Sequence, residues 1–68
     1  MEKYCVNTET NENHYHEVHK MSCDHLPNPE HQKDLGYCNS CSDALSKAHG
    51  YYQFVDGCYY CCRSCNYH

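Results

Sequence analysis

The sequence predicts a small α+β domain with two or three short β-strands, one short helix and a C-terminal cysteine knuckle. Only seven of the 68 residues are Leu, Ile, Val or Phe, about a tenth of the chain, whereas roughly 20% is the level below which a packed core is not expected. Eight Cys and seven His residues provide another means of holding the chain together. A chain this small therefore needs disulfides or a metal to offset the conformational entropy lost on folding.

The N-terminal third predicts a β-hairpin. Residues 3–7 (KYCVN) alternate between polar and apolar side chains, as a half-buried strand does. Residues 8–13 (TETNEN) are rich in turn formers, and residues 14–20 (HYHEVHK) alternate again as the returning strand. On that second strand Val18 and His19 face opposite sides, because successive side chains of a strand alternate.

The middle and the end of the chain predict further short strands. Residues 21–34 contain two prolines and are expected to form an extended loop. Residues 35–39 (LGYCN) and 51–55 (YYQFV) both have strand composition. The Asp56-Gly57 dipeptide then predicts a turn into the final cysteine cluster.

One helix is predicted over residues 42–49 (SDALSKAH). Ser40 or Ser42 can serve as its N-cap, and Asp43 lies in the first turn, where a negative charge is favourable. Gly50 follows the last turn as an expected stop signal. The apolar face of this helix consists of Ala and Leu only, so its contribution to a core is small.

Metal binding is favoured over disulfides because nothing in the sequence indicates export. The N-terminus has no apolar run like that of a signal peptide, and no segment is long and apolar enough to span a bilayer. We therefore expect a cytoplasmic protein, in which clustered Cys and His residues indicate metal ligands. A structural zinc contributes roughly 10–16 kcal/mol to a small domain. The expected fold is a single zinc-stabilised domain over residues 1–68, although thiolate and imidazole ligands also suit Fe or Cu(I).

The C-terminal segment 58–65 carries two C-x2-C pairs end to end, Cys58 with Cys61 and Cys62 with Cys65. Neighbouring residues point in divergent directions, so the two pairs are expected to serve different centres. One combination, of spacing typical for a four-cysteine structural zinc site, is Cys38, Cys41, Cys58 and Cys61. The other, with three cysteines and one histidine, is His19, Cys23, Cys62 and Cys65. Other knuckles, Cys58 with Cys61 or Cys61 with Cys65, could also join Cys23. On spacing alone the four-cysteine combination is the more specific.

The segments EVHKMSC, LGYCNSCSDALSKAHG and CCRSC, in this order over residues 17–65, resemble the zinc-binding module of the Ada methylphosphotriester repair protein. A five-residue insertion (YQFVD) precedes the last pair. The resemblance implies a principal zinc site of His19, Cys23, Cys62 and Cys65. It makes Cys38 a core residue and leaves a second zinc at Cys38, Cys41, Cys58 and Cys61 as an additional hypothesis. The C-terminus, residues 57–65, is also similar to that of short uncharacterised bacterial proteins with a GCYYCCxxCH-type end.

The chain departs from the repair family at the residue that carries the chemistry. His19 stands where the family has its methyl-accepting cysteine, and imidazole is a poor replacement for that thiolate in alkyl transfer. The basic residues around the last pair are reduced to Arg63. The resemblance therefore extends to the zinc site and not to repair activity.

The function predicted from the sequence is that of a non-enzymatic zinc module for protein interaction. The net charge of −4 and the scattered Lys and Arg residues argue against nucleic acid as a partner, and no membrane association is expected. The eight tyrosines are expected to complete the core and to form an exposed aromatic surface, especially Tyr51, Tyr52, Tyr59 and Tyr60. Alternatives are a thiol-rich metal buffer or carrier and, with less support, a redox or alkyl-accepting thiol protein. Cys5 is expected to be a buried strand residue, and His68 a reserve ligand for the C-terminal site.

Overall fold

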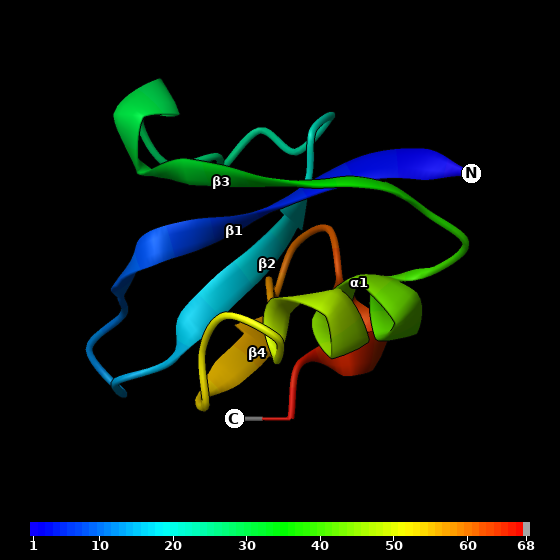
Figure 1. Cartoon of the computed structure of the whole chain (residues 1–68). Helices are drawn as coiled ribbons and strands as arrows, with labels where there is room; N and C mark the ends of the chain where they lie inside the picture. The colour runs from blue at the N-terminus through cyan, green and yellow to red at the C-terminus, as the bar shows by residue number, and fades with distance from the viewer. Residues whose placement is uncertain (68) are drawn as a thin grey trace.

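A four-stranded β-sheet in the order β3-β1-β2-β4 forms the framework of the computed structural model, which describes residues 1–67 (Figure 1). The strands are β1 (Glu2–Thr10), β2 (His16–Lys20), β3 (Gln32–Cys38) and β4 (Val55–Gly57). β1 pairs antiparallel with both β2 and β3, whereas β4 pairs parallel to β2. The structure thus shows the small α+β fold that the sequence predicts, with the hairpin of β1 and β2 at its centre.

The central strand β1 is longer than predicted and is buried on both faces. Tyr4, Cys5 and Val6 are all at most 3% exposed, although alternate strand residues face opposite sides. A bulge separates the pair Tyr4 and Gly36 from the pair Cys5 and Asp34 in β1 and β3. Gly36 has a φ of 75°, a conformation that glycine adopts without a steric penalty.

The helix α1 spans Cys41–Ala48 and lies against one face of the sheet (Figure 1). Ser40 is the N-cap, since its side chain accepts a hydrogen bond from the amide of Asp43 at 3.2 Å. The Asp43 carboxylate in turn accepts from the Asn39 amide at 3.0 Å. The buried face of α1 consists of Ala44 and Ala48, both fully buried. Their small side chains allow the helix to approach the sheet closely.

The segment before the cysteine cluster differs from the sequence prediction. The predicted strand over residues 51–55 begins only at Val55, because the amide of Tyr52 still bonds to the carbonyl of Ala48 at 3.0 Å. The predicted turn at Asp56 and Gly57 is wrong, since both residues are buried within β4. The parallel pairing of β4 with β2 supplies partners for this backbone and keeps it extended.

The tail after the cluster is held by the carboxylate of Asp56, which is 2% exposed. It accepts hydrogen bonds from the Tyr67 amide at 2.9 Å and from the Asn66 side chain at 3.2 Å. Between the cluster and this tail a single 3-10 turn, η2, spans Arg63–Cys65. The last described residues therefore return to the sheet instead of extending away from it.

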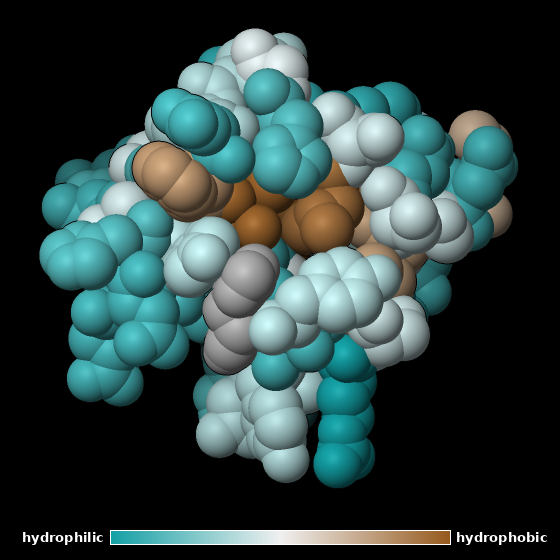
Figure 2. Space-filling view, turned by 90° about the horizontal axis from the view of Figure 1, so that it is seen from below, coloured by the Kyte–Doolittle hydropathy of each residue, from teal (hydrophilic) through white to brown (hydrophobic). Residues whose placement is uncertain are grey.

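The core is small and contains fewer tyrosines than predicted. Of the tyrosines, Tyr4 is buried and Tyr52 packs at the edge of the core. The exposed ones are Tyr37, Tyr51, Tyr59, Tyr60 and Tyr67. In the face seen in Figure 2, hydrophobic surface forms one small area within a mainly hydrophilic surface. The prediction that Tyr51, Tyr59 and Tyr60 help to complete the core is therefore wrong, because buried cysteines take that place, whereas the prediction that they are exposed aromatic residues is confirmed.

Candidate metal centre

Four side chains that can ligate a metal meet where β2 ends and where the loop after β4 begins. The ligand atoms of His19, Cys23, Cys58 and Cys61 all lie within 4.8 Å of one another. His19 belongs to β2, Cys23 to the turn that follows it, and the other two to the loop after β4. We call these four residues the first centre.

The surroundings of His19 favour its neutral imidazole, which is the form that binds a metal. Its side chain is 3% exposed, and its Nδ1 atom is buried and has no hydrogen-bond partner among residues 1–67. Nε2 lies 3.6 Å from the Glu17 carboxylate. Burial lowers the pKa of His19 below its usual value, against the raising effect of Glu17. A metal at Nδ1 would satisfy the orphaned nitrogen, and a carboxylate on the other nitrogen is the usual second partner of a metal-bound imidazole.

Cys23 is positioned by a tight turn at the end of β2. Its amide donates to the Lys20 carbonyl at 3.0 Å, which folds the chain back toward the sheet. The amide of His25 donates to the Cys23 sulfur at 3.3 Å, an interaction that stabilises a thiolate. The Sγ atoms of Cys23 and Cys58 lie 3.9 Å apart. The turn thus aims the sulfur of Cys23 at the loop after β4.

The pair Cys58 and Cys61 is held as a knuckle against the end of β2. The amide of Cys58 donates to the Val18 carbonyl at 2.9 Å and continues the pairing of the two strands. The amide of Lys20 donates to the Cys61 sulfur at 3.3 Å. Backbone amides of Tyr60 and Cys61 donate to the Cys58 sulfur. Amides directed at both sulfurs prepare them to carry negative charge.

Without a metal these sulfurs would remain thiols at neutral pH. Burial is the largest effect on the pKa of Cys58 and of Cys61, and it raises both above the usual value in spite of the amides. A dication in the centre reverses this, because a coordinating thiol is deprotonated outright. One imidazole and three thiolates from the protein make a complete tetrahedral set for Zn²⁺. The donor chemistry of the site therefore fits zinc.

The structure groups the ligands differently from the sequence prediction. It brings His19 and Cys23 together with Cys58 and Cys61, not with Cys62 and Cys65. The reason is the register of the parallel pair, in which Val18 is opposite Gly57. The residue after Gly57 is then adjacent to His19, so the first C-x2-C pair completes the centre. Among the ligand sets considered from the sequence, only the knuckle of Cys58 and Cys61 with Cys23 agrees with this arrangement.

The other predicted ligands lie in α1 and η2 or directly before them. Cys41 and Cys65 form a disulfide, so the proposed four-cysteine combination with Cys58 and Cys61 is not assembled. Cys38 and Cys62 are free thiols, at 0% and 2% exposure. Cys5 is buried in β1, as predicted. His68 lies outside the described residues.

Gly57 is a residue of the site that the sequence analysis did not single out. A Cβ atom there would lie 2.6 Å from the Cys62 carbonyl oxygen and 2.9 Å from the Cys65 Cβ. Both distances are shorter than non-bonded atoms tolerate, so only glycine lets β4 pass beneath η2. An Asp-Gly dipeptide is an ordinary turn signal, which hides this role at the level of the sequence.

Comparison with known proteins gives no relative: no family model, no curated protein and no solved structure matches the chain. The resemblance to the Ada module therefore stays a prediction. Among residues 1–67 no helix has the length and apolar character needed to cross a membrane. The site geometry carries the functional conclusion without support from a relative.

Proposed function

We propose that this chain is a small non-enzymatic module in which Zn²⁺, held by His19, Cys23, Cys58 and Cys61, stabilises the fold. The observation that carries the proposal is the convergence of these four ligand atoms within 4.8 Å from two segments far apart in the sequence. Four protein ligands leave no coordination position for a substrate, as is typical of structural zinc and not of catalytic zinc.

The energetic argument supports a structural ion. The described core consists mainly of the small side chains of valine, alanine and cysteine. Each of them contributes little apolar area. The ion would connect the central hairpin to the segment after β4, which the short strand β4 alone holds weakly. Apparent binding energies of roughly 10–16 kcal/mol for structural zinc exceed the net stability of most small domains.

The module is proposed to bind a protein through tyrosines beside the first centre. Tyr59 and Tyr60 lie in the knuckle, exposed by 53% and 66%, with their rings in an edge contact at 5.3 Å. His25 stacks on Tyr60 at 3.8 Å, and the guanidinium of Arg63 lies 5.2 Å from the Tyr59 ring centroid. Rigid exposed tyrosines are enriched at protein interfaces, and the net charge of −4 disfavours phosphate backbones.

Native mass spectrometry of the reduced protein with zinc tests the structural ion. Cys58→Ser and His19→Ala are each expected to lose one bound zinc and to unfold at a lower temperature. Cys5→Ala is the control, because Cys5 is a buried thiol outside the first centre and should keep the wild-type stoichiometry. Full zinc retention in Cys58→Ser would overturn the assignment. Three or more ions on a chain without cooperative unfolding would instead indicate a metal buffer.

A double variant tests the proposed contact surface. Tyr59→Ala with Tyr60→Ala removes two exposed rings and is expected to keep zinc and the unfolding temperature while losing cross-linked protein partners. Tyr37→Ala is the matched control, because Tyr37 is similarly exposed, at 63%, but lies on β3. Unchanged cross-linking of the double variant would refute this surface.

A further inference from the structure

Two of the four cysteines in the C-x2-C pairs outside the first centre are in direct contact, one from each pair. Cys41 at the start of α1 and Cys65 at the end of η2 are joined as a disulfide, with their Cα atoms 6.4 Å apart. This contact brings the pair Cys38 and Cys41 against the pair Cys62 and Cys65, across 24 residues of sequence. One cysteine of each pair therefore meets the other where α1 begins and η2 ends.

The other two cysteines of these pairs are buried and reduced. Cys38 is fully buried and Cys62 is 2% exposed, and both belong to the core that contains Tyr4. The nearest hydrogen-bond acceptors of the Cys38 sulfur are backbone carbonyls, at 3.8 and 3.9 Å. The Cys38 sulfur therefore makes only weak polar contacts, and both thiols belong to one core cluster.

Cys62 and Cys65 lie in a short turn that follows directly on the turn of the first centre. The amide of Cys65 donates to the Cys62 carbonyl at 2.9 Å, as the amide of Cys62 does to the Cys58 carbonyl at 2.9 Å. Cys41 is the first residue of α1, where the helix dipole favours a thiolate. The pair Cys62 and Cys65 is thus held in a turn, and Cys38 and Cys41 flank the connection from β3 to α1.

From this geometry we propose that Cys38, Cys41, Cys62 and Cys65 form a second metal centre, for Zn²⁺ or a similar thiophilic dication, and that the Cys41–Cys65 disulfide is its oxidised, metal-free form. The ligand pairs of the two centres then alternate along the chain. The first centre takes His19 with Cys23 and Cys58 with Cys61, and the second takes Cys38 with Cys41 and Cys62 with Cys65. This explains why Cys61 and Cys62 are adjacent: Cys61 is the last ligand of the first centre, and Cys62 begins the last ligand pair of the second. The second centre shares no ligand with the first, so either assignment can fail alone.

The change between the two forms is a two-electron oxidation by a small disulfide, RSSR. The Cys41 thiolate attacks one sulfur of RSSR and releases RS⁻, and the Cys65 thiolate then attacks the Cys41 sulfur and releases the second RS⁻. The ion loses two of its four ligands and leaves as Zn²⁺. The thiolates of Cys38 and Cys62 take up one proton each from solvent, which balances the charge and yields the buried thiols of the structure.

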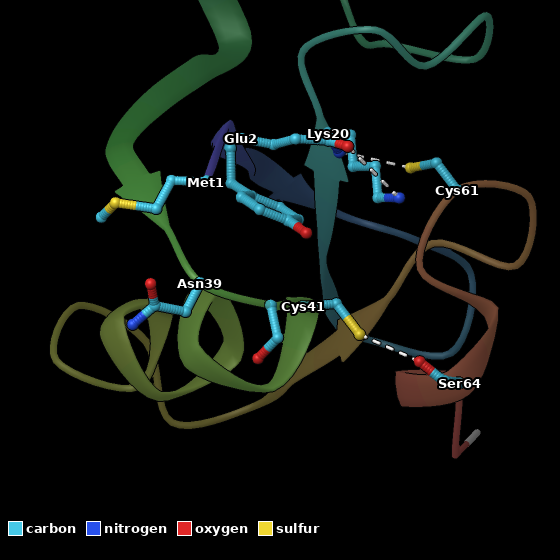
Figure 3. Close-up of a pocket in the computed structure, with 9 residues that line it drawn as sticks. Met1, Glu2, Lys20, Asn39, Cys41, Cys61 and Ser64 are labelled. Atoms are coloured by element: carbon cyan, nitrogen blue, oxygen red, sulfur yellow. Dashed lines mark hydrogen bonds and ion pairs between the residues drawn. The ribbon is translucent and has the colours of Figure 1, made fainter.

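A cavity beside Cys41 gives small reagents a route to its sulfur. It has a volume of about 380 Å³ and is lined by Cys41, Cys61, Lys20 and Ser64, among other residues. In Figure 3 the Cys41 side chain lies beside Ser64, whose Oγ is 3.1 Å from the sulfur, and Cys61 lies on another side of the cavity. Cys41 is only partly buried, whereas Cys38 is fully buried. Oxidation is therefore expected to begin at Cys41.

Native mass spectrometry, with the protein reduced, loaded with zinc and then treated with hydroxyethyl disulfide, tests the proposal. The reduced wild type should bind two zinc ions, and oxidation should release one and leave a Cys41–Cys65 disulfide in the peptide map. Cys62→Ser should bind one zinc, whereas Cys5→Ala, the control, should bind two. Co²⁺ loading gives a second readout that survives a loss of stability, because four thiolates shift the absorption of Co²⁺ relative to three thiolates and an imidazole.

The outcomes separate the two assignments. A single zinc in the reduced wild type that is lost in Cys58→Ser but kept in Cys62→Ser overturns the second centre and leaves the first. A single zinc lost in Cys62→Ser but kept in Cys58→Ser supports the second centre and overturns the first. Oxidation that forms the Cys41–Cys65 disulfide without zinc release also overturns the second centre.

Discussion

Gly57 shows how one missing Cβ atom shapes the site. The backbone of Cys62 and Cys65 occupies the space where a side chain would begin. A Cβ atom at position 57 would lie 2.6 Å from the Cys62 carbonyl oxygen and 2.8 Å from the Cys65 carbonyl carbon. Backbone atoms cannot rotate away as the end of a flexible side chain can. The close approach of β4 to η2 therefore depends on this position.

Gly57→Ala is expected to lower the free energy of unfolding by about 3 kcal/mol, the upper end for overpacking, and to weaken zinc binding, since Cys58 follows directly. Gly50→Ala is the matched control, because its Cβ would meet only the Lys47 carbonyl oxygen at 3.1 Å. Denaturant unfolding and zinc competition with a chromophoric chelator measure both effects. Equal stability of the two variants would contradict the close approach.

Cys5 gives a prediction for alkaline pH. Burial raises the pKa of its thiol to about 11, and the Asp34 carboxylate adds to the effect. A pKa that is higher in the folded state contributes stability that is complete below the unfolded value, near 9, and is lost as the pH rises through 11. The free energy of unfolding of the wild type should therefore fall by up to about 3 kcal/mol relative to Cys5→Ala over this range. Parallel pH profiles of the two proteins would refute the shift.

At the scale of elements, the helix depends on its N-terminal cap. α1 has eight residues, fewer than an isolated helix needs to be stable in water. Ser40 and Asp43 satisfy two backbone amides that would otherwise lack partners at its start. The cap also fixes the backbone between Cys38 and Cys41, which connects β3 to the helix.

Ser40→Ala is expected to cost about 1 kcal/mol of unfolding free energy, the typical value of an N-cap. Ser46→Ala is the control, because Ser46 is exposed within the same helix, and alanine there favours the helix slightly. Urea unfolding followed by circular dichroism measures both variants. A stability of Ser40→Ala equal to that of Ser46→Ala would show that the cap contributes nothing.

For the whole molecule, the proposed structural zinc and the disulfide would both cross-link distant segments of a chain with a small apolar core. The first centre connects β2 to the segment after β4, and the disulfide connects α1 to η2. Both act on the same C-terminal residues, which pair with the sheet through only three residues of β4. The two cross-links are therefore expected to act cooperatively.

A zinc chelator added to the reduced protein is expected to unfold the whole chain in one transition, because no described part has a core large enough to persist alone. Far-ultraviolet circular dichroism and tyrosine fluorescence should change together, and added zinc should restore both. Calcium in excess serves as the control and should restore neither, because thiolates do not select a hard cation. Retention of the native spectrum after complete zinc removal would contradict a structural role.

The sequence by itself determined the class of fold, the hairpin, the helix and two candidates for its cap, because alternation and capping residues act locally. It also indicated metal ligation and the division of the doubled C-x2-C motif at Cys61 and Cys62. Which pair serves which centre depends on the register of β4 against β2, and a three-residue strand leaves almost no trace in the sequence. The parallel pairing places Cys58 beside His19 and makes Asp56 and Gly57 part of a buried strand instead of a turn. Most tyrosines lie at the surface. Only the tertiary structure decided these points, because each depends on contacts between residues far apart in the chain.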